Sequence, residues 1–387
     1  MLLVERHYTK GNPTIIKLCQ TSKDLYNRCN FLMRKAWFTK QRLPDITILT
    51  NETKNLDCFK QLHNTKTAKQ TIRKVLTDWS NYRKALTAYN KDKSKFVRCP
   101  KAPNYKKKLA QVIFYNETIK GGQVHKILPN LTATNNCFSV RFKENYKQVV
   151  ITPKTFGFMI EVQYESNESK KKVKLNKNKV CTIDIGLNTL AAITLDQQRP
   201  ILINGRILKS INQWYNKRPC KSRLRKRYFR IENYFHHCSK FIIDLCVKHK
   251  VGKLIIGKND GWKQNINLGK KTNQAFCMIP TYLLLEKIKY KANMVGIDVI
   301  FTEESYTSQS SFFDNDPLPK YGDDKVDFSG KRKYRGLYVS KDGFAVNADV
   351  NGSLNIGRKV IPEFARIGDR SLAARPQVIN PLKNITV

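Results

Sequence analysis

Acidic side chains interrupt or follow three separate apolar stretches of this chain. Asp184 lies inside the apolar run 180–185, Glu303 and Glu304 follow a second run, and Asp349 stands where a last helix is expected to begin. Burying an ionised carboxylate costs several kcal/mol unless a cation or hydrogen-bond donors compensate it. Carboxylates that converge from rigid elements can hold two Mg²⁺ ions ~4 Å apart, which is what two-metal phosphodiester hydrolysis requires.

Each of these carboxylates also has an ordinary structural explanation. The Gly-Leu-Asn turn after residue 185 would satisfy Asp184, and Asp349 would serve as a helix cap or dipole partner. Gly186 permits the close approach of a backbone or a ligand. A metal site is favoured by the combination, because three widely spaced elements each supply a carboxylate.

The composition predicts a soluble nucleic-acid-binding protein. The 387 residues suffice for two or three domains, and a hydrophobic content of 41% excludes global disorder. The 72 Lys and Arg against 30 Asp and Glu give a formal net charge of +42, which repels itself unless a polyanion neutralises it. No apolar run approaches the ~20 residues of a spanning helix, and a signal-peptide layout is lacking. We therefore expect a cytoplasmic protein with no membrane partner.

The ten cysteines are scattered without a Cys-x-x-Cys pair, which predicts free thiols in a reducing compartment. The local cluster His236-His237-Cys238 is a poor zinc chelate, because adjacent side chains on a helix point in different directions. We therefore expect no zinc at this cluster.

In the N-terminal half, the spacing of apolar residues changes from a helical period to the period of two that is typical of strands. A short strand at 2–8 precedes two long amphipathic helices at 13–37 and 65–89, whose outer faces are basic. An extended basic linker follows at 100–108. From 111 to 164 apolar residues alternate with period two, which predicts a small β-barrel or sandwich that the N-terminal strand could join.

The C-terminal half alternates strands with helices, as α/β folds do. In open α/β sheets ligands bind beyond the carboxyl ends of the strands, where Asp184 and the two glutamates are expected. The predicted elements are strands at 180–185, 191–195, 201–203, 251–257 and 297–304, a helical tract at 209–250, a helix at 280–295, a hairpin at 336–344 and a helix from 347.

The first half of the helical tract is rich in arginine, lysine and aromatic residues. This texture suits contact with a nucleic-acid backbone together with base stacking. For any single basic residue an ordinary solvated face is the simpler explanation. Our candidates for contacts to a nucleic-acid backbone are Arg223, Arg225, Lys226 and Arg227.

Three segments together resemble a known family. Residues 182–188, 306–308 and 347–356 look like the three RuvC signatures of TnpB, the transposon-encoded, RNA-guided DNA nuclease related to type V CRISPR effectors and to Fanzor proteins. Residues 18–27 and 100–107 are similar to the family's N-terminal half. The order and spacing of these motifs carry the resemblance over nearly the whole chain.

The resemblance implies an α/β multidomain fold in which a RuvC nuclease domain, RNase H-like, follows a wedge β-barrel with an inserted helical recognition lobe. The implied parts are the wedge domain at 1–10 and 109–169, the recognition lobe with its basic linker at 11–108, the nuclease domain at 170–313 and 346–387, and a degenerate zinc-ribbon-like insertion at 314–345.

The resemblance also implies an activity and its partners. One copy of the chain would bind a transposon-derived guide RNA, recognise a short adjacent motif and cut double-stranded target DNA, leaving 3′-hydroxyl and 5′-phosphate ends. Base pairing rather than side chains would read most of the sequence. Mg²⁺, with Mn²⁺ as an alternative, would be held by Asp184, Glu304 and Asp349. The protein would be prokaryotic, cytoplasmic, and associated with the nucleoid when bound to DNA.

The chain departs from the TnpB pattern in two places. Gly257 stands where the commoner pattern has its glutamate, so we infer that Glu304 supplies the second acid, with Glu303 as second choice and Asp260 as third. Cysteine pairs of a zinc ribbon are missing from 308–345, so we expect no structural zinc.

The sequence is also compatible with other functions. The chain could be a nuclease-inactive, RNA-guided DNA-binding repressor, or a miniature type V CRISPR effector. An accessory protein of transposition would need no guide RNA. An actin-like sugar kinase also opens with Asp-Ile-Gly, but the charge of +42 and the lack of later Gly-rich phosphate loops disfavour it.

Overall fold

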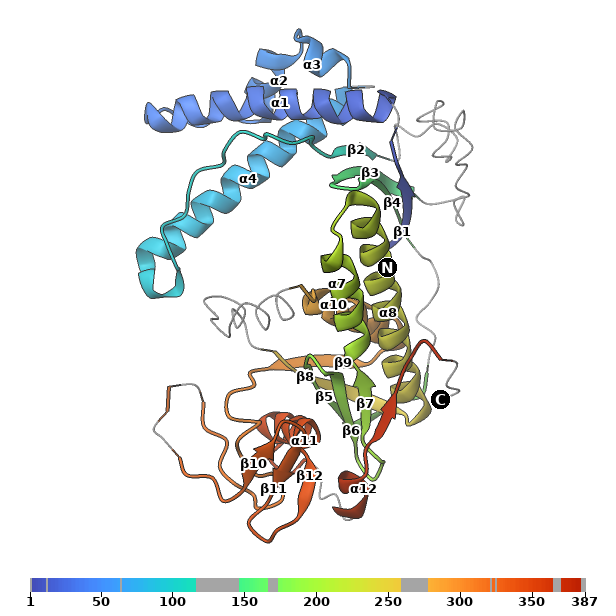
Figure 1. Cartoon of the computed structure of the whole chain (residues 1–387). Coiled ribbons are helices and arrows are strands. Elements are labelled where there is room, and N and C mark those ends of the chain that lie inside the picture. Colours follow the sequence, from blue (N-terminus) through green and yellow to red (C-terminus); the bar gives the residue numbers. More distant parts are fainter. Residues whose placement is uncertain are drawn as a thin grey trace. The chain divides into compact units, whose positions relative to one another are not determined.

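The computed structural model describes the chain except residues 1, 12, 63–64, 116–145, 166–172, 259–277, 321, 324–325, 365–369 and 384–387. The chain divides into two compact units, Met1–Asn167 and Glu168–Val387 (Figure 1). Each unit combines helices with β-sheet, which confirms the predicted mixed α/β multidomain fold.

The first unit contains a four-stranded antiparallel sheet in the order β1-β4-β3-β2. The N-terminal strand joins it by pairing with β4, as expected. Residues 116–145 of the alternating stretch lie outside the described residues, and closure into a barrel stays a prediction. The strands are β1 (Leu2–Thr9), β2 (Val112–Tyr115), β3 (Tyr146–Lys154) and β4 (Gly157–Glu165).

The described residues of the first unit also contain four α-helices. The long helices α1 (Pro13–Phe38) and α4 (Thr65–Lys91) agree with the predicted periodicity, and the shorter α2 (Ile46–Thr53) and α3 (Asp57–Lys60) pack against them. Their shared core includes the fully buried Trp79. The short 3₁₀ helix η1 (Lys93–Lys95) follows α4.

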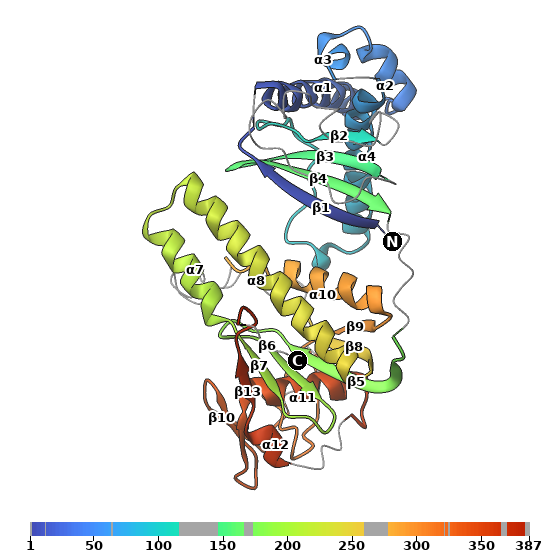
Figure 2. The same ribbon diagram turned by 90° about the vertical axis from the view of Figure 1, so that its right-hand side faces the viewer.

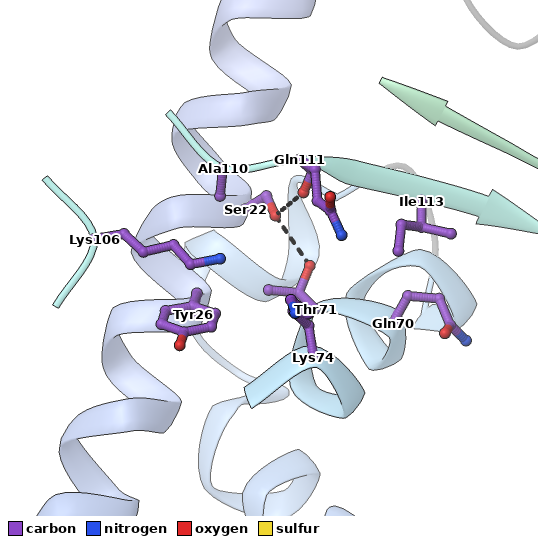
Figure 3. Close-up of a pocket in the computed structure, with 9 residues that line it drawn as sticks. All are labelled: Ser22, Tyr26, Gln70, Thr71, Lys74, Lys106, Ala110, Gln111 and Ile113. Atoms are coloured by element: carbon purple, nitrogen blue, oxygen red, sulfur yellow. Dashed lines mark hydrogen bonds between the residues drawn. The ribbon is translucent and has the colours of Figure 1, made fainter. Parts of the chain in front are cut away.

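Hydrogen bonds join the two long helices to the segment that enters the sheet (Figure 3). Ser22 Oγ donates to the carbonyl of Gln111 over 2.8 Å, so it accepts from Thr71 Oγ1, which lies 3.1 Å away. The Lys106 ammonium lies 3.8 Å from the ring centroid of Tyr26. The hollow between these residues measures about 10 Å³, roughly the space of one water molecule. It is therefore a packed joint rather than a ligand site.

The second unit is built on a six-stranded sheet in the order β13-β7-β6-β5-β8-β9. The strands β5, β6 and β7 form the predicted antiparallel meander, whereas β8 and β9 run parallel to β5. The carboxyl ends of these three parallel strands therefore lie at one edge. The strands are β5 (Asn176–Asp184), β6 (Thr189–Leu195), β7 (Ile201–Asn204), β8 (Val251–Gly257), β9 (Asp298–Thr302) and β13 (Gln377–Ile379).

The side chains of β5 alternate between two cores on opposite faces of the sheet. Cys181 and Ile183 belong to the core shared with α8 (Lys221–Lys248) and α10 (Thr281–Val295). The even-numbered residues face α11 (Ala348–Val360), which covers the other face (Figures 1 and 2). The same alternation therefore directs the side chain that ends β5, Asp184, toward α11.

The predicted helical tract at 209–250 is divided, so the expectation of one continuous tract was wrong. A first helix, α7 (Arg206–Lys217), ends before Pro219, and α8 begins at residue 221. Proline lacks a backbone N–H and disfavours helical backbone at the residue before it, which explains the break. The helix α10 agrees with its prediction, since it ends at Gly296 with a positive φ of 86°.

The region after β9 contains a three-stranded antiparallel sheet where only a hairpin was predicted at 336–344. Its strands are β10 (Lys331–Tyr334), β11 (Leu337–Val339) and β12 (Ala345–Asn347). All four residues of β10 are exposed. Because an exposed strand of basic residues shows no apolar alternation, the sequence pattern did not reveal it. The short helix α12 (Arg370–Ala374) precedes β13.

Hydrogen bonds hold the segment where the TnpB pattern has zinc-binding cysteines. The carboxylate of Asp316 accepts from the backbone N–H groups of Ser311 and Ser329 over 2.8 and 3.1 Å. From α11, the amides of Asn351 and Asn355 donate to the carbonyl of Ser310 over 2.9 and 2.7 Å. These contacts join the segment to α11 without the use of a metal, and the absence of a structural zinc stays a prediction.

The cysteines and the helices of the described residues can be compared with two further expectations. Its eight cysteines are free thiols. None of its helices combines the length and the apolarity that a bilayer crossing would need.

Candidate active site

The structure places Asp184 and Glu304 at the same edge of the six-stranded sheet. Asp184 ends β5, and Glu304 lies just beyond the end of β9. The strand β8 runs between these two strands and parallel to both. Two strand spacings amount to roughly 10 Å, so a side chain has to reach across the end of β8 for the two carboxyl groups to interact.

Gly257, the last residue of β8, leaves the space that Glu304 occupies. A Cβ atom on this glycine would lie 2.6 Å from both Cγ and Oε1 of Glu304, and 2.6 Å from Cδ1 of Ile356. Non-bonded carbon and oxygen atoms do not approach so closely. A side chain at 257 and the observed position of Glu304 therefore exclude one another.

Asp349 enters the site from the first turn of α11. Asn347, rather than Asp349, caps this helix. The Oδ1 atom of Asn347 accepts from the backbone N–H groups of Asp349 and Val350 over 2.9 and 3.2 Å. One turn further, a Cβ on Gly352 would lie 2.8 Å from Oδ2 of Asp184. The helix therefore lies directly against the carboxylate of β5, and the Asp349 side chain is not used as a cap.

A buried cluster of three hydroxyl groups fixes α11 on the sheet. Ser353 Oγ lies 3.0 Å from Thr182 Oγ1 and 3.1 Å from Thr194 Oγ1, and the two threonines also bond to each other. All three residues are buried, so these bonds form away from competing water. Since Thr182 is two residues from Asp184 on the same strand face, the cluster positions Asp349 relative to Asp184.

Burial and like charges raise the pKa of two of the three acids. Burial, followed by the negative charge of Asp349, raises the pKa of Asp184 to about 7, against the opposing effect of Arg332. Burial, followed by the charges of Asp184 and Glu303, raises the pKa of Glu304 to about 8. The three candidate carboxylates thus interact electrostatically, and a bound cation would relieve their repulsion.

The two adjacent glutamates have different surroundings. Glu303 pairs with the ammonium of Lys359 and accepts from the backbone N–H of Ser305 over 3.0 Å. Burial opposes its ionisation, but these bonds outweigh burial and hold the pKa of Glu303 below its usual value. The third choice, Asp260, lies outside the described residues. The geometry therefore joins Glu304, rather than Glu303, to Asp184.

Arg332 is a residue of the site that sequence reasoning missed. Its Nη2 lies 3.6 Å from Oδ1 of Asp349, and its positive charge also acts on Asp184. In the sequence it was one of several basic residues in a loop-rich stretch, so only its spatial position distinguishes it. Gly257 had been noticed as a departure from a pattern, but its role as space for Glu304 required the structure.

The donor set fits a divalent metal by its chemistry. Three carboxylates from a strand, a strand end and a helix are the oxygen ligands that Mg²⁺ prefers. In the part of the chain that the structure describes, no three acidic, histidine or cysteine side chains already form a metal-holding group. Asp184, Glu304 and Asp349 therefore share one electrostatic site without a closed ligand set.

The four basic candidates of the helical tract differ in what they contact. Arg223 donates to the carbonyl of Trp214 over 3.2 Å and lies 5.1 Å from its ring centroid. Arg227 donates from Nε to Asn212 Oδ1 over 2.7 Å, and burial lowers its pKa. These two residues fasten α8 to α7. Arg225 is half-buried and Lys226 is exposed.

Comparison with known proteins finds a family similarity in one part of the chain. Residues 282–356, which contain Glu304, Arg332 and Asp349, match the family described as Cas12f1-like, TNB domain. This match supports the predicted relationship to TnpB and Cas12-type proteins over that region. No curated protein matches the chain.

Solved structures of Cas12f proteins show a weak overall likeness. A Cas12f1–sgRNA–target DNA complex aligns at 14% identity with a TM-score of 0.35, covering 92% of this chain and 98% of that one. A CRISPR-Cas12f ternary complex aligns at 12% identity with a TM-score of 0.36, covering 88% and 80%. Likeness at this level carries no conclusion about function.

Replacing Gly257 with alanine is expected to displace Glu304. Overpacking a well-packed position costs about 1–3 kcal/mol, so Gly257→Ala should lower the free energy of unfolding by that amount. Removing the Glu304 side chain should restore part of the lost free energy of unfolding. The double variant Gly257→Ala/Glu304→Ala is therefore expected to lose less free energy of unfolding than the two single variants lose together. Denaturant unfolding of all four proteins measures this coupling, and strictly additive effects would contradict the assigned clash.

The raised pKa values predict a pH-dependent stabilisation by Mg²⁺. Between the usual carboxyl pKa near 4 and pKa values of about 7 and 8, the native site retains protons that the unfolded chain has released. Without metal, this site therefore loses stability as the pH rises through that window. Bound Mg²⁺ favours the ionised carboxylates, so it should raise the Tm more at pH 8.5 than at pH 6.

Thermal unfolding at both pH values, with and without Mg²⁺, tests this expectation. At an ion concentration of 100 times Kd, stabilisation amounts to about 2.7 kcal/mol. Asp184→Asn is expected to abolish most of the Mg²⁺ effect. A Tm increase that is equal at both pH values, or that persists in Asp184→Asn, would place the ion elsewhere.

Proposed function

We propose that this chain is an RNA-guided, Mg²⁺-dependent endonuclease that cuts double-stranded DNA with a single RuvC-type site. The observation that carries the proposal is the meeting of Asp184 and Glu304 across Gly257, with Asp349 on the helix that covers them. The meander β5–β7, extended by the parallel strands β8 and β9, supports the assignment of this unit as an RNase H-like nuclease domain.

The charge distribution supports nucleic acids as partners. The net charge of +42 favours association with a polyanion. A shallow depression along α4 in the first unit is lined by Arg83, Lys84 and Lys91, all exposed. Lys226 on α8 is exposed in the second unit. We assign such residues to the backbones of the guide RNA and its heteroduplex, whereas Arg223 and Arg227 position α8.

The site residues would divide the work in the following way. Asp184, Glu304 and Asp349 would hold Mg²⁺ or Mn²⁺, which when bound activates water and stabilises the leaving oxygen. The raised pKa values keep protons on Asp184 and Glu304 near neutral pH until a cation compensates their charge. The hydroxyl cluster around Ser353 keeps α11 in register with the sheet, so that Asp349 stays opposite Asp184.

A nuclease-inactive, RNA-guided DNA-binding repressor is the second candidate. It is favoured by the contact of Arg332 with Asp349 and by the lack, among the described residues, of a ready metal-holding group. In this case the basic surfaces would serve target binding alone.

Co-purification followed by a cleavage assay separates these candidates. The chain would be expressed with its native flanking DNA, and the bound RNA sequenced. A discrete RNA, with Mg²⁺-dependent cleavage of a matching duplex that Asp184→Ala reduces by more than a thousandfold, is the expected result, since catalytic groups in nucleases contribute on this order. The origin of that RNA, a transposon end or a CRISPR array, identifies the source of the guide.

The other outcomes are equally informative. Target binding without cleavage would favour the repressor, and no discrete RNA would contradict guided function. A second test places the carboxylate at position 257 instead of 304. In the Glu304→Ala background, Gly257→Glu should restore part of the cleavage that Glu304→Ala removes. A double variant as inactive as Glu304→Ala would contradict the idea that the two positions reach the same place.

A further inference from the structure

A hollow of about 400 Å³ adjoins the candidate active site on the side of Asp349. Its walls come from five places in the second unit: the β5–β6 turn, the junction of β7 with α7, the β10–β11 turn, the start of α11 and the strand β13. The residues that define it are Asn188, Asn204, Arg206, Arg335, Asn347 and Asp349. Its volume falls in the range of sites that hold a small ligand, about 300–1,000 Å³.

Three cations gather around this hollow. Arg206 and Arg335 line it and are exposed, and the ammonium of Lys209 donates to the side-chain oxygen of Asn188 in its wall. Desolvation, followed by the charges of Arg335 and Arg206, lowers the pKa of Lys209. Among the described residues, no carboxylate pairs with any of these three cations. The cluster is therefore repulsive by itself and is suited to an anion.

The position of the carboxylates limits which anion fits. Asp349 forms part of the wall, so the anion lies beside the acidic site rather than within it. Guanidinium groups recognise phosphate by paired, charge-assisted hydrogen bonds, and amide side chains such as those of Asn188 and Asn204 add neutral donors. A chain of phosphates that passes the carboxylates would place a neighbouring phosphate next to Arg206 and Arg335.

We propose that this hollow is a subsite for a phosphodiester of the DNA strand being cut, adjacent to the phosphate at which cleavage occurs. The proposal rests on the proposed nuclease function. Arg206 and Arg335 bind the phosphate oxygens, and Lys209 holds Asn188 in place while adding its charge. This contact sets the position of the strand relative to Asp184 and Asp349, so the subsite determines which bond is cut.

Neutral phosphate analogues test the subsite in the full chain bound to its co-purified guide RNA. Target duplexes would carry a single methylphosphonate at successive positions on either side of the cut. The wild-type complex is expected to lose about ten- to a hundredfold in single-turnover rate at one of these positions, the effect of one lost charge-assisted hydrogen bond. Arg206→Gln and Arg335→Gln should each be slower on the unmodified target but show little further loss at that same position.

Matched variants separate a specific contact from a general loss of charge. Lys248→Gln removes one positive charge from an exposed position at the end of α8, and it should behave as wild type. Arg335→Lys retains the charge and should recover part of the rate. The subsite would be overturned if Arg206→Gln and Arg335→Gln cleaved as fast as Lys248→Gln. It would also be overturned if methylphosphonate reduced the rate equally at every position of the target.

A binding measurement keeps the subsite testable if the wild-type complex does not cut. That result would contradict the nuclease function but not the anion site. Target-DNA affinity would then be measured against salt concentration, where each lost phosphate contact lowers the slope by about 1. If the salt dependence of Arg206→Gln and Arg335→Gln has the same slope as that of Lys248→Gln, the subsite is overturned. Lower slopes than that of Lys248→Gln would support the subsite.

Discussion

Repulsion between carboxylates at one edge of a sheet is the constraint on which the second unit depends. Besides burial, the charge of Asp349 raises the pKa of Asp184, and the charge of Asp184 raises the pKa of Glu304. Groups that repel stay together only where the surrounding structure holds them. The parallel order of β5, β8 and β9 sets the edge, two apolar cores fix the sheet from both faces, and the hydroxyl cluster around Ser353 fixes α11.

Positions 257 and 304 are far apart in the sequence but lie close together at this edge of the sheet. The strands β8 and β9 are neighbours and end together, with Gly257 paired to Thr302. A carboxylate beyond the end of β9 reaches the region next to Asp184 only if β8 ends in a residue without a side chain. A side chain at 257 and the observed position of Glu304 are therefore alternatives, because a Cβ at 257 would lie 2.6 Å from Glu304.

Cations lie at the acidic site and in the hollow beside it. Arg332 contacts Asp349, while Arg206 and Arg335 line the adjoining hollow. A polyanionic strand is attracted by such groups, whereas three carboxylates alone would repel it. In the proposed function the two charge types have separate tasks: the basic residues would attract phosphate to this edge, and the acids would bind a divalent cation there.

The amino-acid sequence by itself determined the strands β5, β6, β7 and β8, the helices α1, α4 and α10, and the short list of acids, because burial on one face leaves a period in the pattern. It did not reveal the exposed strand β10 or the break at Pro219, although the latter had a local signal in the proline itself. Only the tertiary structure showed that Glu303 pairs with Lys359, that Glu304 lies against Gly257, and that Arg332 is a neighbour of Asp349. The physical reason is that periodicity specifies which face of an element is buried, whereas the charge and space around a side chain depend on residues far away in the sequence.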